Sequence, residues 1–151
     1  METDALVMAQ KMGVTPTAEA VRFLGFALAQ VPPGQPIWLD RKEIPVEHIF
    51  TPGLYMRTAE LAGPAILMTR AHLTKHPFTV IAGECFVWDS VRDEVQALVA
   101  PMRGITEPGT VRLIFVPEHV AWTTVHATNE TDPERIVETM TALPIFAALP
   151  A

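Results

Sequence analysis

The sequence predicts an all-β core, folded as a small antiparallel barrel or double sheet, with one helix before it and a short helix after it. Short apolar runs bounded by proline and glycine fill the segment from residue 46 to residue 128. The long helical crossovers that a parallel sheet requires are missing between these runs. A length of 151 residues fits a single domain with its own core.

The N-terminal helix is expected over Ala18 to Gln30. Thr15-Pro16-Thr17 supplies helix-start residues, and the apolar positions that follow have helical spacing (Val21, Leu24, Ala27 and Leu28). Val31 to Pro36 contains three prolines and a glycine and must end the helix. Residues 1–45 are therefore interpreted as a helical segment with a proline-rich linker.

Seven runs after Pro45 have the composition of strands. They are Gly53 to Thr58, Ala65 to Ala71, Phe78 to Ala82, Cys85 to Trp88, Val95 to Val99, Val111 to Val116 and Val120 to Thr128. Thr131 to Arg135 then resembles a helix start, with a proline near the first turn, and the helix should continue to about Thr141. We interpret residues 46–142 as the barrel with its closing helix, and residues 143–151 as an apolar arm.

Composition narrows the possible partners. The net charge of -6 and the scattered basic residues argue against nucleic-acid binding. Hydrophobic residues make up 49% of the chain and charged residues 19%, which favours a homo-oligomer, and we expect a homodimer. The start of the sequence does not resemble a signal peptide, and no apolar run is long enough to span a membrane, so we expect a cytoplasmic protein without a membrane partner.

The most informative segment is Arg70-x-His72-x-x-x-His76, followed after six residues by Gly83. In an extended strand, Arg70, His72, Thr74 and His76 would all point to one face, so two imidazoles and a guanidinium would share a pocket. The alternative is that the two histidines are hydrogen-bonded core residues. Cys85, the single cysteine, is interpreted as an inert core thiol, His119 as an exposed turn residue and His48 as a packing residue.

This spacing resembles the first motif of the cupin superfamily. In that motif two histidines are followed by a glutamate and then by a glycine. In this sequence Arg70 occupies the position of the first histidine, His72 that of the second, His76 that of the glutamate and Gly83 that of the glycine. Pro108-Gly109 resembles the turn of the second cupin motif, with Arg112 in place of its histidine. The resemblance implies a cupin-like jelly roll in which several usual metal ligands have been replaced.

A strand from Ala121 to Thr128 would complete the pocket. Alternation places Trp122, Thr124, His126 and Thr128 on one face. His126 would then join His72 and His76 as a third ligand for a divalent metal such as Zn, Fe, Ni or Mn. No nucleotide-cofactor motif is found, and no catalytic residue can be assigned.

Arg70 and Arg112 suggest a different use of the same pocket. An arginine remains charged and offers a planar fork to a carboxylate or phosphate, so two arginines in place of histidines would convert a metal cage into an anion receptor. Trp122 and Thr124 would contribute to the ligand-binding wall. The alternative is that both arginines form structural ion pairs with Glu84, Glu107 or Glu118.

A wider set of residues resembles small cupin-like proteins encoded by tailed bacteriophages. The set spans roughly His48 to Glu138 and consists of four short motifs, together with Asp132 at the start of the last helix. The motifs are His48-x-Phe50-x-Pro52-Gly53-x-Tyr55-x-Arg57, His72-x-x-x-His76, Pro108-Gly109-Thr110-x-Arg112 and Trp122-Thr123-Thr124-x-His126. This resemblance implies the fold and, for a phage-encoded chain, the host cytoplasm. It implies no particular reaction.

Three hypotheses follow. The first is a pocket for a small anionic ligand, with or without a divalent metal and enzymatic activity. The second is a phage structural or host-interaction protein that uses the barrel as an oligomeric scaffold, suggested by the 14 prolines and the apolar residues 143–149. The third is a non-catalytic sensor or sponge for a signalling anion.

Overall fold

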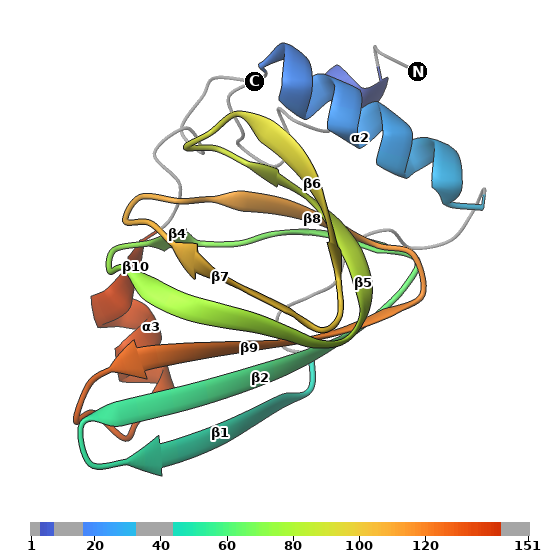
Figure 1. The fold of residues 1–151 in the computed structure, drawn as a ribbon. Coiled ribbons are helices and arrows are strands. Elements are labelled where there is room, and N and C mark those ends of the chain that lie inside the picture. The colour runs from blue at the N-terminus through green and yellow to red at the C-terminus, as the bar shows by residue number, and fades with distance from the viewer. Residues whose placement is uncertain (1–3, 8–16, 33–43, 143–151) are drawn as a thin grey trace.

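The computed structural model describes residues 4–7, 17–32 and 44–142. In these ranges the chain forms an antiparallel sheet of eight strands that curls into a barrel, with one helix packed outside it and another at its end (Figure 1). The predicted fold class, an antiparallel barrel or double-sheet jelly roll with a helix near each end, is confirmed. Most of the predicted linker and all of the C-terminal arm, residues 33–43 and 143–151, lie outside the described residues.

The strands follow one another closely along the chain. They are β1 (Val46–Thr51), β2 (Leu54–Ala62), β3 (Ala65–Met68), β4 (Ala71–His72), β5 (His76–Asp89), β6 (Glu94–Val99), β7 (Met102–Thr106), β8 (Arg112–Val116), β9 (His119–Ala127) and β10 (Thr141–Ala142). The main sheet has the order β1-β2-β9-β5-β8-β3, and β6 and β7 both pair with β5. A separate two-residue ladder joins β4 to β10. No helix in the described part of the chain has the length and apolar character needed to cross a membrane.

β5 is the strand on which the barrel is built. Its first half pairs with β7 and β9, and its second half pairs with β6 and β8. The change occurs at Gly83, whose φ is 72° and whose added Cβ would lie 2.0 Å from the carbonyl oxygen of His119. The predicted pair of strands separated by a glycine turn is therefore wrong, because glycine lets one long strand bend between two faces of the barrel.

Helix α2 (Ala18–Gln30) has the predicted bounds. The Thr17 side chain accepts a hydrogen bond from the backbone N–H of Ala20 and caps the helix. Its buried side chains include Phe23 and Leu24, which belong to one apolar cluster with Trp88 of β5 and Phe115 of β8. Figure 1 shows α2 lying across the outside of the barrel near β6 and β8.

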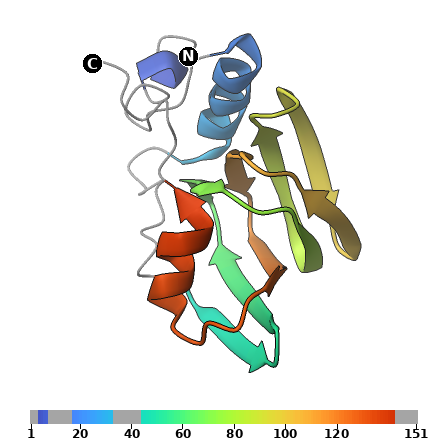
Figure 2. The ribbon, with the colours of Figure 1, turned by 90° about the vertical axis from the view of Figure 1, so that its left-hand side faces the viewer.

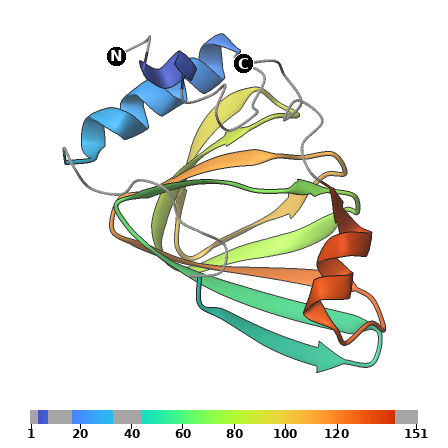
Figure 3. The ribbon, with the colours of Figure 1, turned by 180° about the vertical axis from the view of Figure 1, so that it is seen from behind.

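Helix α3 (Pro133–Met140) begins after the capping residue Asp132, as predicted, and ends one residue before Thr141. Figures 2 and 3 show it standing beside the barrel, at the end where β4 and β10 pair. Ile136 is its buried residue. This placement puts α3 over one side of the barrel interior.

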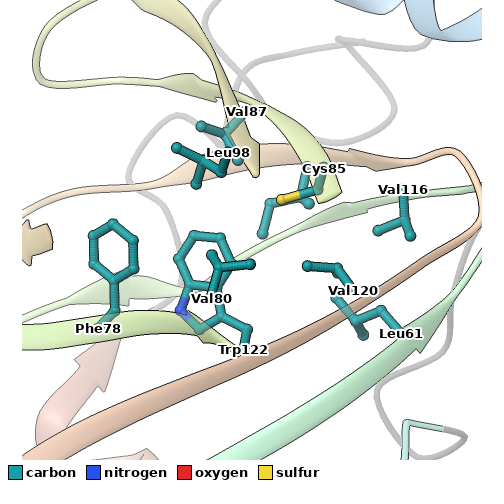
Figure 4. Packing of buried hydrophobic residues seen from close by; sticks show 10 residues of the cluster. Leu61, Phe78, Val80, Cys85, Val87, Leu98, Val116, Val120 and Trp122 are labelled. Atoms are coloured by element: carbon teal, nitrogen blue, oxygen red, sulfur yellow. The ribbon is translucent and has the colours of Figure 1, made fainter. Parts of the chain in front are cut away.

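A second apolar cluster fills the barrel away from α3. Phe78, Val80 and Trp122 lie together in it, with Cys85 close by (Figure 4). Cys85 is fully buried, and burial raises the pKa of its thiol to about 12. The interpretation of Cys85 as an inert core thiol agrees with this environment.

Candidate functional site

A cavity of about 140 Å³ lies inside the barrel between the strands and α3. Every residue predicted for metal or ligand binding lines it: Arg70, His72, His76, Arg112, Trp122, Thr124 and His126. These residues come from β4, β5, β8 and β9 and from the link between β3 and β4. The structure thus brings the predicted site residues to one place.

The three histidine rings form a compact group. The centroid of the His76 ring lies 4.7 Å from that of His72 and 4.3 Å from that of His126, and His72 and His126 are 6.5 Å apart. The predicted continuous strand face is wrong, however, because β4 ends at His72 and β5 begins at His76. Thr74 lies in the intervening loop and is exposed. The loop, rather than strand alternation, brings the two rings together.

The glycine turn of the second motif holds this loop in place. The backbone N–H of Gly109 donates to the carbonyl oxygen of His72 at 2.6 Å, and the N–H of His72 donates to the carbonyl oxygen of Thr110 at 3.2 Å. Gly109 has a φ of 86°, which favours glycine. The two segments that resemble cupin motifs are therefore hydrogen-bonded to each other at the site.

Hydrogen bonding leaves two imidazole nitrogen atoms without a partner. The carbonyl oxygen of Thr74 can only accept, so Nδ1 of His76 must donate to it at 3.0 Å, and Nε2 of neutral His76 carries a lone pair. His126 uses Nε2 to bond Thr124 Oγ1 at 2.9 Å. His76 Nε2 and His126 Nδ1 are buried and have no hydrogen-bond partner among the described residues. A buried polar atom in this state calls for a water, a ligand or an ion.

The three histidines that line the cavity are uncharged at neutral pH. Burial, followed by the charges of neighbouring histidines and arginines, lowers the pKa of His72 to about 3 and that of His126 to about 4. Burial also lowers the pKa of His76, although its hydrogen bond to Thr74 opposes the shift. The imidazoles therefore supply neutral donors and acceptors, and the positive charge of the site comes from arginines.

Arg112 is buried at the base of the cavity. Its Nη1 donates to Thr106 Oγ1 at 3.0 Å, and its guanidinium carbon lies 4.9 Å from the centre of the Phe78 ring and 5.6 Å from that of Trp122. Asp89 Oδ2 is 4.0 Å from Arg112 Nε. Burial lowers the pKa of Arg112, and Asp89 opposes the shift.

Arg70 lies at the side covered by α3. Its Nε donates to Thr141 Oγ1 at 2.8 Å. Within the described ranges, neither Arg70 nor Arg112 forms an ion pair with Glu84, Glu107 or Glu118, which was the structural alternative. Among the described residues, the ion-pair partner of these two arginines is Asp89, beside Arg112.

Arg57 and Tyr55 of β2 also line the cavity, although neither was predicted as a site residue. Strand pairing sets Tyr55 opposite His126 and Arg57 opposite Thr124. The Arg57 side chain has no hydrogen bond or ion pair in the portion of the chain that the structure describes, and burial lowers its pKa. The spacing Tyr55-x-Arg57 within a predicted strand was the signal that could have identified both residues.

The other two histidines lie outside the cavity lining. His48 Nδ1 is 2.6 Å from the Tyr55 hydroxyl oxygen, and its ring stacks on those of Phe50 and Tyr55. His119 is exposed at the start of β9. His48 is hydrogen-bonded, as expected for a packing residue, and His119 is exposed as predicted, although it lies at a strand end.

The cavity residues can be compared with the requirements of the predicted divalent metal site. Neutral imidazoles with unpartnered nitrogen atoms are chemically suited to a divalent ion. Yet in residues 4–7, 17–32 and 44–142 no group of three or more His, Cys, Asp or Glu side chains is arranged to hold one. The donors are of the right kind, but the described residues form no three-ligand group as they stand, so the three-histidine centre stays a prediction.

No known family model matches the chain, and no curated protein matches it in sequence. A solved protein from Photorhabdus luminescens is similar in structure, with a TM-score of 0.52, 10% identity, and 67% of this chain and 88% of that chain covered. At this identity the likeness shows the fold alone.

Two further solved structures carry descriptive names. A Klebsiella pneumoniae protein with a double-stranded β-helix domain has a TM-score of 0.49 and 19% identity, covering 64% of this chain and 86% of that chain. A cupin-2 domain of a transcriptional regulator from Enterobacter cloacae has a TM-score of 0.47 and 15% identity, covering 58% and 98%. At scores below one half, these two likenesses support no conclusion about function.

Proposed function

We propose that the chain is a small-molecule-binding protein whose barrel cavity holds a small anionic ligand. The observation that carries this proposal is the charge of the cavity: Arg57, Arg70 and Arg112 line it, and no aspartate or glutamate among the described residues does so. Each guanidinium can offer two parallel N–H groups to a carboxylate or phosphate. Asp89 offsets one of these charges.

The surroundings strengthen the attraction for an anion. Burial weakens the hydration of Arg57 and Arg112, which is why the pKa of each is lowered. Both side chains remain charged at neutral pH. An anion that replaces the lost hydration would be bound in a medium of low dielectric constant, where each charge-assisted hydrogen bond is stronger than at the surface.

Ligand-induced stabilisation tests the proposal. Protein is titrated with inorganic phosphate, malonate and benzoate while the thermal unfolding midpoint is followed. At a hundredfold excess over Kd, the binding anion should stabilise the fold by about 2.7 kcal/mol, or roughly 5–10 °C. Arg57→Gln should weaken that anion's binding about tenfold or more, because one charged donor group is lost.

Arg103→Gln is the matched control, since Arg103 is exposed on β7 and lies outside the cavity lining. It removes the same charge and should leave the response unchanged. If none of the three anions shifts the midpoint, or if both variants respond like the wild type, the cavity is not an anion site.

A metal-binding role is a second candidate, favoured by the unpartnered His76 Nε2 and His126 Nδ1. Elemental analysis of protein purified without a histidine tag, before and after incubation with Zn²⁺, tests it. This candidate requires about one ion per chain in the wild type and none after the double change His72→Ala and His76→Ala. Absence of bound metal from the wild type in both conditions contradicts it.

A further inference from the structure

The cavity is polar at one end and apolar at the other, and strand register establishes this order. On β2, Tyr55 and Arg57 are followed by Ala59 and Leu61 at the next inward positions. The partners on β9 change in the same direction, from His126 and Thr124 to Trp122. Polar residues of the two strands therefore share one end of the cavity.

On β5 and β8, too, polar residues lie at one end of the cavity and apolar residues at the other. On β5, His76 is followed by the buried Phe78 and Val80, which pair with Thr124 and Trp122. On β8, Arg112 is followed inward by Ile114, which pairs with Leu67 of β3. Arg112 belongs to the His76 end because it bonds Thr106, the register partner of His76.

α3 lies beside the histidine end of the cavity and contributes apolar side chains to its lining, namely Ile136, Val137 and Met140. At the opposite end, Leu61, Ile114 and Trp122 offer nothing to a second charged group. A ligand with charges at both ends would leave one of them buried without a partner, at a cost of several kcal/mol.

The volume limits the size of the apolar body. An apolar cavity of about 150 Å³ takes one benzene ring, and this cavity measures about 140 Å³. We infer that the ligand is amphiphilic and charged at one end only: one carboxylate or phosphate head at Arg57 and the histidines, and one apolar body no larger than a single ring toward Trp122 and Ile114. This inference rests on the proposed anion-binding function and specifies its ligand class.

Calorimetric titration with three matched probes tests the inference. Benzoate has both the head and the ring, benzamide keeps the ring without the charge, and inorganic phosphate has the charge without the ring. We expect benzoate to bind at least about tenfold more tightly than either of the others. Arg57→Gln should reduce benzoate affinity about tenfold and benzamide affinity much less, because a neutral amide has no charge to pair with the guanidinium, whereas Arg103→Gln should affect neither.

A variant of the apolar end tests the position of the ring. Leu67 lines the cavity from β3 opposite Ile114 and is only partly buried, so Leu67→Asn should disturb folding less than a change at a fully buried position. It should weaken benzoate severalfold and leave phosphate unchanged.

The outcomes separate the two proposals. If phosphate binds as tightly as benzoate in an Arg57-dependent manner, the anion site stands and the apolar body is wrong. If benzamide binds as tightly as benzoate, or no probe binds, the anion site itself is wrong. If Leu67→Asn weakens phosphate and benzoate equally, the assignment of the ring to the apolar end is overturned.

Discussion

His72 and His126 are neutral in the folded chain because burial and neighbouring charges remove the benefit of protonation. An unfolded chain has histidines with a pKa near 6.5. Below that pH the unfolded state takes up protons that the folded state does not, so stability is greatest above about pH 6.5 and falls as the pH is lowered toward the folded values.

This difference predicts acid sensitivity. Each of the two histidines should cost about 1.4 kcal/mol of stability per pH unit below 6.5, down to about pH 4. Urea unfolding of metal-free protein at several pH values measures the slope. His72→Gln should reduce it by up to about 1.4 kcal/mol per unit, while His119→Gln, at an exposed position, should not. Equal slopes in wild type and His72→Gln would contradict the neutral assignment.

Asp93 connects helix α2 to the sheet through two hydrogen bonds. Its Oδ1 accepts from the indole Nε1 of Trp88 and from the Thr17 hydroxyl, both at 2.8 Å. Asp93→Ala should cost about 1–3 kcal/mol, since it leaves the N–H of a buried tryptophan without an acceptor. Chemical denaturation measures the loss. Asp93→Asn keeps an acceptor and tolerates the φ of 52° at this position, so it should cost much less; equal losses would show that these bonds contribute little.

Most of the site residues could be predicted from the chemistry of their side chains. The histidines and the arginines at 70 and 112 were predicted to share a pocket, and they line one cavity. The prediction that His72 and His76 share one face of a continuous strand was wrong, because a loop separates them. Arg57 was missed as a site residue because a lone arginine on a strand is usually solvated, and its burial in the cavity is a property of the folded chain.

Helix α2 was predictable because its signals are local. Thr17 caps it, and apolar residues recur at helical spacing until Val31 and the prolines that follow. The strands were harder to predict. β1 and β7 were missed since their residues are partly exposed and lack a continuous apolar run. The bend in β5 was predicted as a turn between two strands, because a glycine between two apolar runs is equally typical of a turn and of a bend within one strand.

Gly83 should be the most sensitive glycine of the barrel. A Cβ there would meet the His119 carbonyl oxygen at 2.0 Å as well as adopting an unfavourable φ. Gly83→Ala should therefore cost more than about 3 kcal/mol, or prevent folding. Gly53→Ala is the matched control: its φ is 79° but nothing lies within 4 Å of the added Cβ, so only about 1 kcal/mol should be lost. Thermal unfolding compares them, and similar losses would argue against the tight crossing of β5 and β9.

For the whole molecule, strand register determines what the cavity can bind. Alternation along one strand indicates which residues point inward, but it does not indicate that Arg57 lies opposite Thr124, or Ala59 opposite Trp122. That order depends on long-range pairing, because the residues in each of these two pairs are more than 60 positions apart in the sequence. The polar-to-apolar gradient of the cavity therefore could not be read from the sequence, although its component residues could.

The whole protein is expected to form a homodimer. Size-exclusion chromatography with light scattering should give twice the chain mass of 16.6 kDa. The prediction rests on the apolar composition, because burying the excess apolar surface between two copies would remove it from water. A mass of one chain at every concentration would contradict it.

The central claim is that one cavity receives an anion at its arginine end. A crystal structure of the protein with benzoate tests it most directly, because the electron density of the planar ring and its carboxylate shows the orientation of the ligand. We expect the carboxylate within hydrogen-bond distance of the Arg57 guanidinium and the ring nearer to Trp122. An empty cavity in crystals grown with saturating ligand, or a carboxylate bound away from all three arginines, would contradict the account.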